Sequence, residues 1–207
     1  MKNNKIIYIV RHGETNFNKL GIVQGSGVDT DLNEIGLLQA IMFYNAYKNV
    51  VFDKIYISSL RRTKQSIQAF INMGVSYEIM PELNEISWGV LEGKSQDFNE
   101  REVYQLAVNE WNNGNYDVAV ENGETPNQLQ NRQRIALDKI LSSKDEKTIL
   151  VCMHGRALKS LVCLLLNNEL NKMDEYQHTN LGLYLFNFDG QNFELLKRND
   201  VAHLMKV

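Results

Sequence analysis

Residues 5–15 read KIIYIVRHGET. The first six of these residues, Lys5 to Val10, form a short apolar run that predicts a buried strand. Arg11 and His12 follow directly, and Gly13 comes next. Glycine lets the backbone approach a ligand closely, so the end of this strand is a candidate binding site.

Two further stretches repeat this arrangement. Residues 148–153 form a second short apolar run, followed by His154 and Gly155, and residues 54–57 form a third, followed by Arg62. Helical patterns separate these strands, which predicts an α/β fold, a three-layer sandwich with a mostly parallel central sheet. Ligands of such sheets bind beyond the carboxyl ends of the strands, so we expect these side chains to share one site.

The chain is expected to form one domain over residues 1–207. Asn33 can cap a helix that has Leu37, Ile41 and Tyr44 on its apolar face. The other expected elements are a strand at 77–80, helices at 60–71, 99–112, 126–141 and 156–166, and a terminal hairpin of strands at 183–188 and 193–197.

Composition limits the classes of partner. The net charge of −3 gives no general attraction for nucleic acid or an anionic membrane, so an anion site must be a local cluster of positive charge. The longest nearly apolar stretch, Ala157 to Leu166, is too short to cross a bilayer. The start of the chain lacks the apolar run of a signal peptide, and we expect a cytoplasmic protein. Cys152 and Cys163 lie in apolar runs without metal-ligand spacing, which favours buried thiols.

The residue types at the strand ends suit phosphoryl chemistry. Arg11 and Arg62 offer forked, charged donors for phosphate oxygens. An imidazole can attack phosphorus and form a covalent intermediate, and a nearby carboxylic acid can protonate the departing oxygen.

The motifs, taken in order, resemble the histidine phosphatase superfamily, the phosphoglycerate-mutase-like proteins. The resemblance covers nearly the whole chain. It is carried by Arg11 to Thr15, Asn18, Gln24-Gly25, Leu32 to Gly36, Ser58 to Arg62, Leu83 to Glu85 with Glu92-Gly93, Gly123 to Thr125, His154-Gly155, and Asn199 to Leu204.

This resemblance implies roles for particular residues. His12 would be the nucleophile, and Glu85 the proton donor and later the base for water. The phosphoryl oxygens would be bound by Arg11, Asn18, Ser58, Arg62, His154 and Gly155, with His154 cationic or hydrogen-bonding. The family uses no metal and no organic cofactor for this chemistry, and the expected ligand is a small-molecule phosphate ester.

Several residues keep an alternative interpretation. Glu14, Glu82 and Glu92 compete with Glu85 for the role of the acid. Asn18 could only cap a turn, and Ser58 could only shape the turn after its strand. Arg156 stands where many phosphatases carry glycine; we expect it to be an exposed residue at the start of a helix. We expect no functional role for His178 or His203, the latter holding the C-terminal tail in place.

The predicted function is hydrolysis of phosphate monoesters through a phosphohistidine. Alternatives are a cofactor-dependent phosphoglycerate mutase, or a more specific phosphatase for fructose bisphosphates or alpha-ribazole phosphate.

Residues 94–123 are expected to form a lid, and their two basic and six acidic residues disfavour the polyanion that a mutase must retain. Intact motifs argue against an inactive relative, and the absence of HxH and HxxxH spacing argues against a metallohydrolase that uses the histidines. The sequence leaves the substrate and the oligomeric state open.

Overall fold

The central sheet has six strands in the order β3-β2-β4-β1-β5-β6. The computed structural model describes residues 4–95 and 97–205. The parallel strands are β1 (Lys5–Arg11), β2 (Lys54–Ile57), β3 (Tyr77–Ile79) and β4 (Thr148–Met153), and the antiparallel hairpin is β5 (Leu183–Phe188) with β6 (Phe193–Asp200). The predicted sandwich with a mostly parallel sheet and a terminal hairpin is therefore confirmed.

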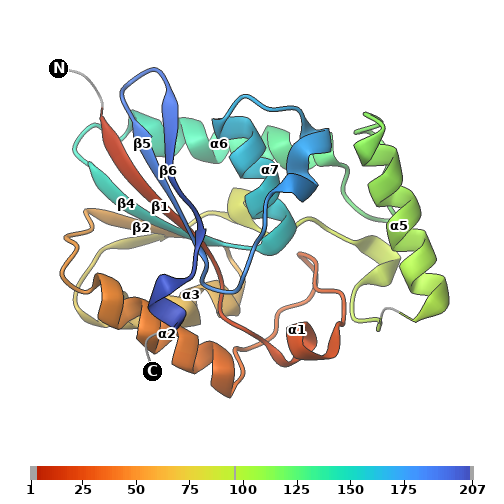
Figure 1. Ribbon diagram of the computed structural model, residues 1–207, viewed down its shortest axis with the longest axis horizontal. Helices are drawn as coiled ribbons and strands as arrows, with labels where there is room; N and C mark the ends of the chain where they lie inside the picture. Colours follow the sequence, from red (N-terminus) through yellow and green to blue (C-terminus); the bar gives the residue numbers. More distant parts are fainter. Residues whose placement is uncertain (1–3, 96, 206–207) are drawn as a thin grey trace.

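Helices cover both faces of the sheet (Figure 1). On one face lie α2 (Glu34–Tyr47), α3 (Arg61–Ser66) and α4 (Gln68–Asn72), and on the other α6 (Pro126–Ser142) and α7 (Gly155–Leu165). Along β4, Ile149, Val151 and Met153 belong to one core cluster, and Leu150 and Cys152 to the other. Strands buried on both faces need continuous apolar runs, which explains the runs in the sequence.

The remaining elements lie mostly around the carboxyl ends of the parallel strands. They are α1 (Asn16–Leu20), α5 (Phe98–Asn112), and four short 3-10 helices, η1 (Pro81–Leu83), η2 (Gly89–Leu91), η3 (Leu170–Glu175) and η4 (Ala202–Leu204). Figure 1 shows α5 at the far right, beyond the strand ends. Within the described residues, every helix is too short or too polar to cross a membrane.

One expected helix is divided. The predicted helix over 60–71 is interrupted at Ile67, which separates α3 from α4. Ser66 Oγ donates to the carbonyl of Arg62 at 2.7 Å, and such side-chain bonds to the preceding turn bend helices. The same hydroxyl accepts a hydrogen bond from the backbone N–H of Gly13 at 2.8 Å, so Ser66 also connects α3 to the loop that follows β1.

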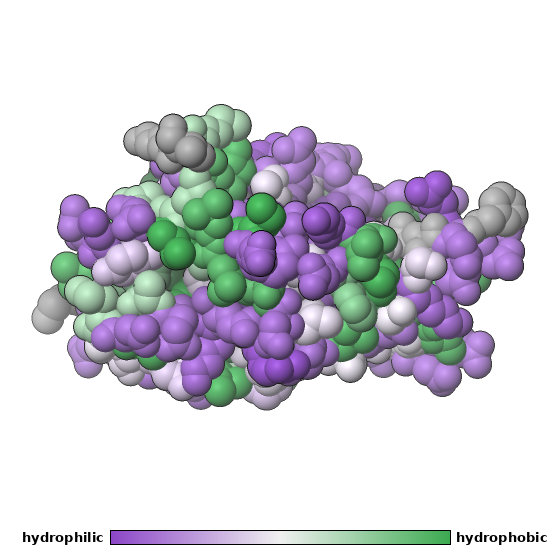
Figure 2. Space-filling model, turned by 90° about the horizontal axis from the view of Figure 1, so that it is seen from below, coloured by the Kyte–Doolittle hydropathy of each residue, from purple (hydrophilic) through white to green (hydrophobic). Residues whose placement is uncertain are grey.

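The predicted apolar face of α2 is only partly buried. Leu37 and Ile41 are about half exposed, Tyr44 packs partly buried against the core, and Phe43 is fully buried. The helix is apolar on most sides, so its periodicity alone could not select the buried side. Gly36 decides the rotation, because a Cβ at this position would lie 2.1 Å from the carbonyl oxygen of Glu14. Figure 2, which views this side of the molecule, shows hydrophobic residues gathered on the surface.

We predict that two substitutions on α2 differ strongly in their effect on stability. Phe43→Ala should lower the free energy of unfolding by about 3–5 kcal/mol, because it leaves a cavity in the core. Ile41→Ala, at a side chain that is 55% exposed, should cost less than about 1 kcal/mol. Urea unfolding of both variants measures the difference, and equal losses would mean that the helix is rotated differently.

Candidate active site

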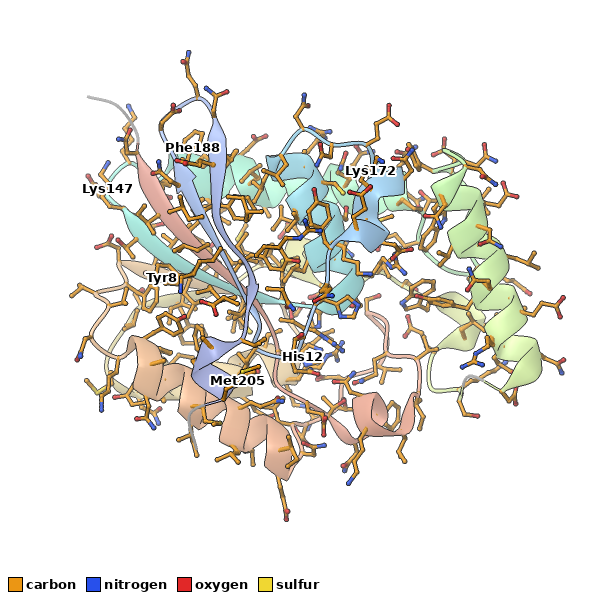
Figure 3. All side chains as sticks on the ribbon, in the orientation of Figure 1. Tyr8, His12, Lys147, Lys172, Phe188 and Met205 are labelled. Atoms are coloured by element: carbon orange, nitrogen blue, oxygen red, sulfur yellow. The ribbon has the colours of Figure 1, made fainter. Side chains whose placement is uncertain are left out.

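The carboxyl ends of three parallel strands bring the predicted site residues together. Arg11 at the end of β1 pairs in register with Met153 of β4, so His12 and His154 emerge side by side. Figure 3 places His12 beyond the strand ends, away from Lys147, which precedes β4. A cavity of about 160 Å³ opens here, and its walls include Arg11, His12, Asn18, Gln24, Glu85, Trp88, Tyr104, Gly155, Arg156 and His178.

Arg62 joins the two histidines. Its side chain is fully buried, and its Nε lies 3.2 Å from both Nε2 of His12 and Nδ1 of His154. An arginine N–H can only donate, so both imidazole nitrogens must accept. The terminal nitrogens of Arg62 donate to the carbonyls of Val28 at 2.6 Å and Gly25 at 3.4 Å.

The other nitrogen of each imidazole identifies the tautomer. His12 Nδ1 lies 2.7 Å from the carbonyl of Gly13, to which it must donate. His154 Nε2 lies 2.7 Å from Ser58 Oγ and donates there. Burial, and then the charge of Arg62, holds the pKa of both histidines well below the ordinary value. His154 is therefore hydrogen-bonded and neutral in this structure, and its expected contact with a phosphoryl oxygen stays a prediction.

The backbone around His12 is fixed by close packing. A Cβ at Gly13 would lie 2.7 Å from the carbonyl oxygen of Gly36, so only glycine lets this loop pass the start of α2. Asn180 Nδ2 donates to the carbonyl of His12 at 2.9 Å. Such contacts fix the direction in which the imidazole of His12 faces the cavity.

Glu85 is the only one of the four candidate acids that lines the cavity with the histidines, among the described residues. Its carboxylate accepts the backbone N–H groups of Ile86, Arg156 and Ala157 at 3.0, 3.0 and 2.7 Å. Two of these donors belong to the first turn of α7, where unpaired N–H groups and the helix dipole favour an anion.

The competing acids have other partners. Glu92 accepts from the backbone N–H groups of Gly27 and Trp88, each at 2.9 Å, and so fastens two loops together. Glu14 accepts from the side chain of Asn33 at 2.8 Å and lines a neighbouring hollow. Glu82 belongs to η1, outside the cavity wall.

The loop that carries Glu85 is held by Arg132, which the sequence did not single out. This arginine of α6 donates to the carbonyls of Glu82, Asn84 and Glu85 at 2.7, 2.8 and 2.9 Å. It also binds both carboxylate oxygens of Glu124, at 2.7 and 2.8 Å. Because an arginine on a helix is usually a surface residue, no local pattern distinguished Arg132.

His178 is a second residue that the sequence analysis missed. Arg11 Nη1 donates to its carbonyl at 3.0 Å and lies 3.1 Å from its Nδ1. Burial and the charge of Arg11 lower the pKa of His178 to about 3. A Cβ at Gly155 would lie 3.2 Å from His178 Nδ1 and 3.5 Å from Arg11 Nε, so glycine leaves room for this pair.

Two predicted site residues, and one residue that was not predicted to belong to the site, have instructive positions. Asn18 forms a capping box with Thr15 and also lines the cavity, so its capping role is confirmed and its contact with phosphate stays a prediction. Ser58 is buried behind His154, which its hydroxyl contacts. The expectation that Arg156 is exposed is wrong: it is 8% exposed and lines the cavity, because Asp174 and Tyr104 bind its guanidinium.

Comparison with families of known proteins gives a match over most of the chain. The model of the histidine phosphatase superfamily (branch 1) matches residues 7–201. A relative from Hydrogenobacter thermophilus named "Putative phosphoserine phosphatase 2" is 27% identical over 204 residues, which are 98% of this chain and 99% of the relative. A relative from Yersinia pestis named "Probable phosphoglycerate mutase GpmB" is 33% identical over 161 residues, 77% of this chain and 74% of the relative.

Solved structures share the fold. A mutant phosphoserine phosphatase from Entamoeba histolytica, in complex with phosphoserine, superposes with a TM-score of 0.83 at 26% identity. The superposition covers 97% of this chain and all of that one.

We predict that the protein loses stability on mild acidification. The pKa values of His12, His154 and His178 are lowered on folding, so below pH 6.5 the unfolded chain binds more protons than the folded one. From pH 6.5 to 5, the free energy of unfolding should fall by up to about 1.4 kcal/mol per pH unit for each histidine. Urea titrations at several pH values measure the slope, and His178→Asn should make it shallower. A flat or rising profile in this window would contradict the neutral histidines.

Proposed function

The chain belongs to the histidine phosphatase superfamily, and from this premise we propose that it hydrolyses phosphate monoesters of small metabolites through a phosphohistidine on His12. The observation that carries the proposal is the tautomer of His12. Its Nδ1–H is bound to the carbonyl of Gly13, so Nε2 keeps an unprotonated lone pair. A neutral imidazole is the nucleophilic form, and the lowered pKa of His12 maintains it at neutral pH.

The first step transfers the phosphoryl group to His12. A bond forms between Nε2 and phosphorus while the bond from phosphorus to the ester oxygen breaks, and Glu85 gives that oxygen a proton. In the second step Glu85 removes a proton from water, whose oxygen forms a bond to phosphorus while the bond from phosphorus to Nε2 breaks, and inorganic phosphate is released. His12 is then restored with its lone pair on Nε2.

Charge neutralisation in this proposal comes from the protein. Arg11 and Arg62 balance the phosphoryl charge, and Asn18 adds a hydrogen bond. His154 joins them by taking up a proton on Nδ1 when the phosphoryl group binds, since both of its nitrogens are otherwise engaged by Arg62 and Ser58. The described residues contain no group of three or more histidine, cysteine, aspartate or glutamate side chains that could hold a metal ion. We propose that neither a metal nor an organic cofactor takes part; the cytoplasmic location stays a prediction from the sequence.

Phosphoglycerate mutase activity is the second candidate, since one relative carries that name. A mutase must keep a second phosphate in place and shield the phosphohistidine from water. In the described part of the proposed lid, residues 94, 95 and 97–123, the side chain that lines the cavity is Tyr104, while Lys94 faces Glu100 at 3.9 Å. Trp111 is 1% exposed and packs against Trp88. This cover supports hydrolysis more than retention of a bisphosphate.

The first test is to trap the intermediate. A radiolabelled phosphate monoester is mixed with the enzyme and quenched in alkali, where phosphohistidine survives. We expect label on His12 and none in His12→Ala, whose turnover should fall by at least about 10³-fold. Label on another residue, or full turnover by His12→Ala, would sink the proposal.

The second test examines the acid. Glu85→Gln cannot donate a proton, and an alkoxide leaving group needs one, whereas nitrophenolate hardly does. The variant should lose about 10²–10⁴-fold in kcat/KM on glycerol 3-phosphate and less than about tenfold on p-nitrophenyl phosphate. Glu82→Gln is the matched control, expected to resemble the wild type on both. Equal losses on both substrates in Glu85→Gln would assign the proton to another group.

A further inference from the structure

Helix α2 is apolar on most of its sides, but its own protomer covers only part of it. Leu37, Leu38 and Ile41 are each about half exposed and, at about 100° per residue, lie well away from the buried Phe43. Figure 2 shows hydrophobic residues gathered on this side of the molecule. A helix that is apolar all round normally lies inside a larger structure, and an exposed apolar patch of this kind marks a docking surface.

The ends of this exposed face carry opposite charges. Glu34, the first residue of α2, and Lys48, its C-terminal cap, are both exposed and are the charged residues of the segment 34–48. They are about four turns apart with Ile41 midway between them, so all three lie on one stripe of the helix. Among the described residues, neither Glu34 nor Lys48 has an ion-pair partner.

The other charged groups around α2 are engaged within the protomer. α3, α4 and η4 pack against this helix, and a hollow beside its C-terminal half includes part of β6. The engaged groups are Arg61 with Asp29 and Asp31, Lys64 over the ring of Tyr77, and Lys197 with Asp200. Within the ranges that the structure describes, Glu34 and Lys48 are therefore the charges that this face offers to a partner.

We propose that α2 binds α2 of a second copy of this chain, antiparallel to it, about a two-fold axis that passes Ile41. Since Ile41 is midway along the stripe, this axis places Glu34 of each copy opposite Lys48 of the other, and Ile41 against Ile41. A symmetrical interface uses every contact twice, and the two helix dipoles oppose each other. A parallel pairing would instead bring Glu34 against Glu34 and Lys48 against Lys48.

The hollow beside α2 gives the second copy a place to dock. It has a volume of about 530 Å³, and its walls include Met42, Asn45 and Ala46 of α2. In the antiparallel pair the half-exposed Leu38 of the second copy lies level with Asn45, along the rim of this hollow. Each copy therefore supplies one apolar side chain and receives one, as a self-complementary surface must. Met205, which follows η4 and is 77% exposed, extends the apolar surface next to α2 (Figure 3).

A second copy suits this face better than a lipid surface does. Helices that lie on membranes are rich in lysine and arginine on their polar side, which attract anionic lipids. Segment 34–48 has one cation, Lys48, and one anion, Glu34, and the whole chain has a net charge of −3. Opposite charges at the two ends fit a copy of the same helix turned end for end.

The first test measures association of the full chain by sedimentation velocity, from micromolar to near-millimolar concentration. We expect a monomer–dimer equilibrium for the wild type. Ile41→Glu places two carboxylates at the two-fold axis and should weaken the dimer at least about a hundredfold, because these charges would be desolvated side by side. Ile135→Glu, at an isoleucine of α6 that is 61% exposed, is the matched control and should leave the dimer unchanged.

The second test reverses the charges at the ends of α2. Glu34→Lys sets two positive charges against each other twice in the antiparallel pair and should weaken the dimer about tenfold. The double variant Glu34→Lys/Lys48→Glu should restore it, because each reversed residue again meets an opposite charge. The melting temperature of each variant, measured at a concentration where the monomer dominates, shows that the protomer is folded.

Three results would overturn the inference. They are a wild type that stays monomeric throughout this range, a dimer that Ile41→Glu and Ile135→Glu leave equally strong, and a Glu34→Lys dimer as strong as that of the wild type. A monomeric wild type that sediments with vesicles of phosphatidylcholine and phosphatidylglycerol, and loses this binding in Ile41→Glu, would assign the face to a membrane instead. Hydrolysis through His12 is measured separately, so none of these results decides the proposed function.

Discussion

One N–H group, on Nε of the buried Arg62, organises the site. It faces Nε2 of His12 and Nδ1 of His154 at equal distances of 3.2 Å, so both rings must present a lone pair to it. In the described part of the chain, the whole guanidinium of Arg62 is hydrogen-bonded to these imidazoles and, through its terminal nitrogens, to two backbone carbonyls, while Glu85, Asp29 and Glu92 act on it only from a distance. A buried cation without a hydrogen-bonded anion is costly, so the arrangement favours binding of a phosphoryl group. Burial lowers the pKa of Arg62 only to about 10, and it stays charged at neutral pH.

The parallel sheet makes this interaction possible. β4 lies between β1 and β2, with Arg11 beside Met153 and Ile57 beside Cys152 in register, so the three strands end at one level. The side chains that follow them converge without a long loop. α7 then starts directly after β4 and presents its first N–H groups to Glu85. His12, the residue proposed to accept the phosphoryl group, directly follows β1. Glu85, the residue proposed to protonate the alcohol, is bound to the start of α7, which follows the neighbouring strand β4.

The features of the site that depend on residues close together in the chain could be predicted from the sequence. Apolar runs followed by Arg11-His12 and His154-Gly155 identified the strands, the edge of the sheet and the central residues of the site. Contacts between distant parts of the chain could not be predicted. Arg132 reaches carbonyls 47 to 50 positions away, and Arg11 meets His178 at a separation of 167. The rotation of α2 likewise depends on packing at Gly36, which hydrophobic periodicity does not report.

Some residues around the cavity are held by backbone groups and others by side chains, and this difference explains where substrate specificity can change. The groups proposed for chemistry are held by backbone: His12 by the carbonyl of Gly13, and Glu85 by three N–H groups. Substitutions elsewhere leave such contacts intact, because every residue supplies the same backbone atoms. The part of the cavity wall around Arg156 is held by side chains instead, namely those of Tyr104 and Asp174. A fold with this arrangement can change these side chains and accept a new alcohol, while the residues proposed to bind and transfer the phosphoryl group stay unchanged.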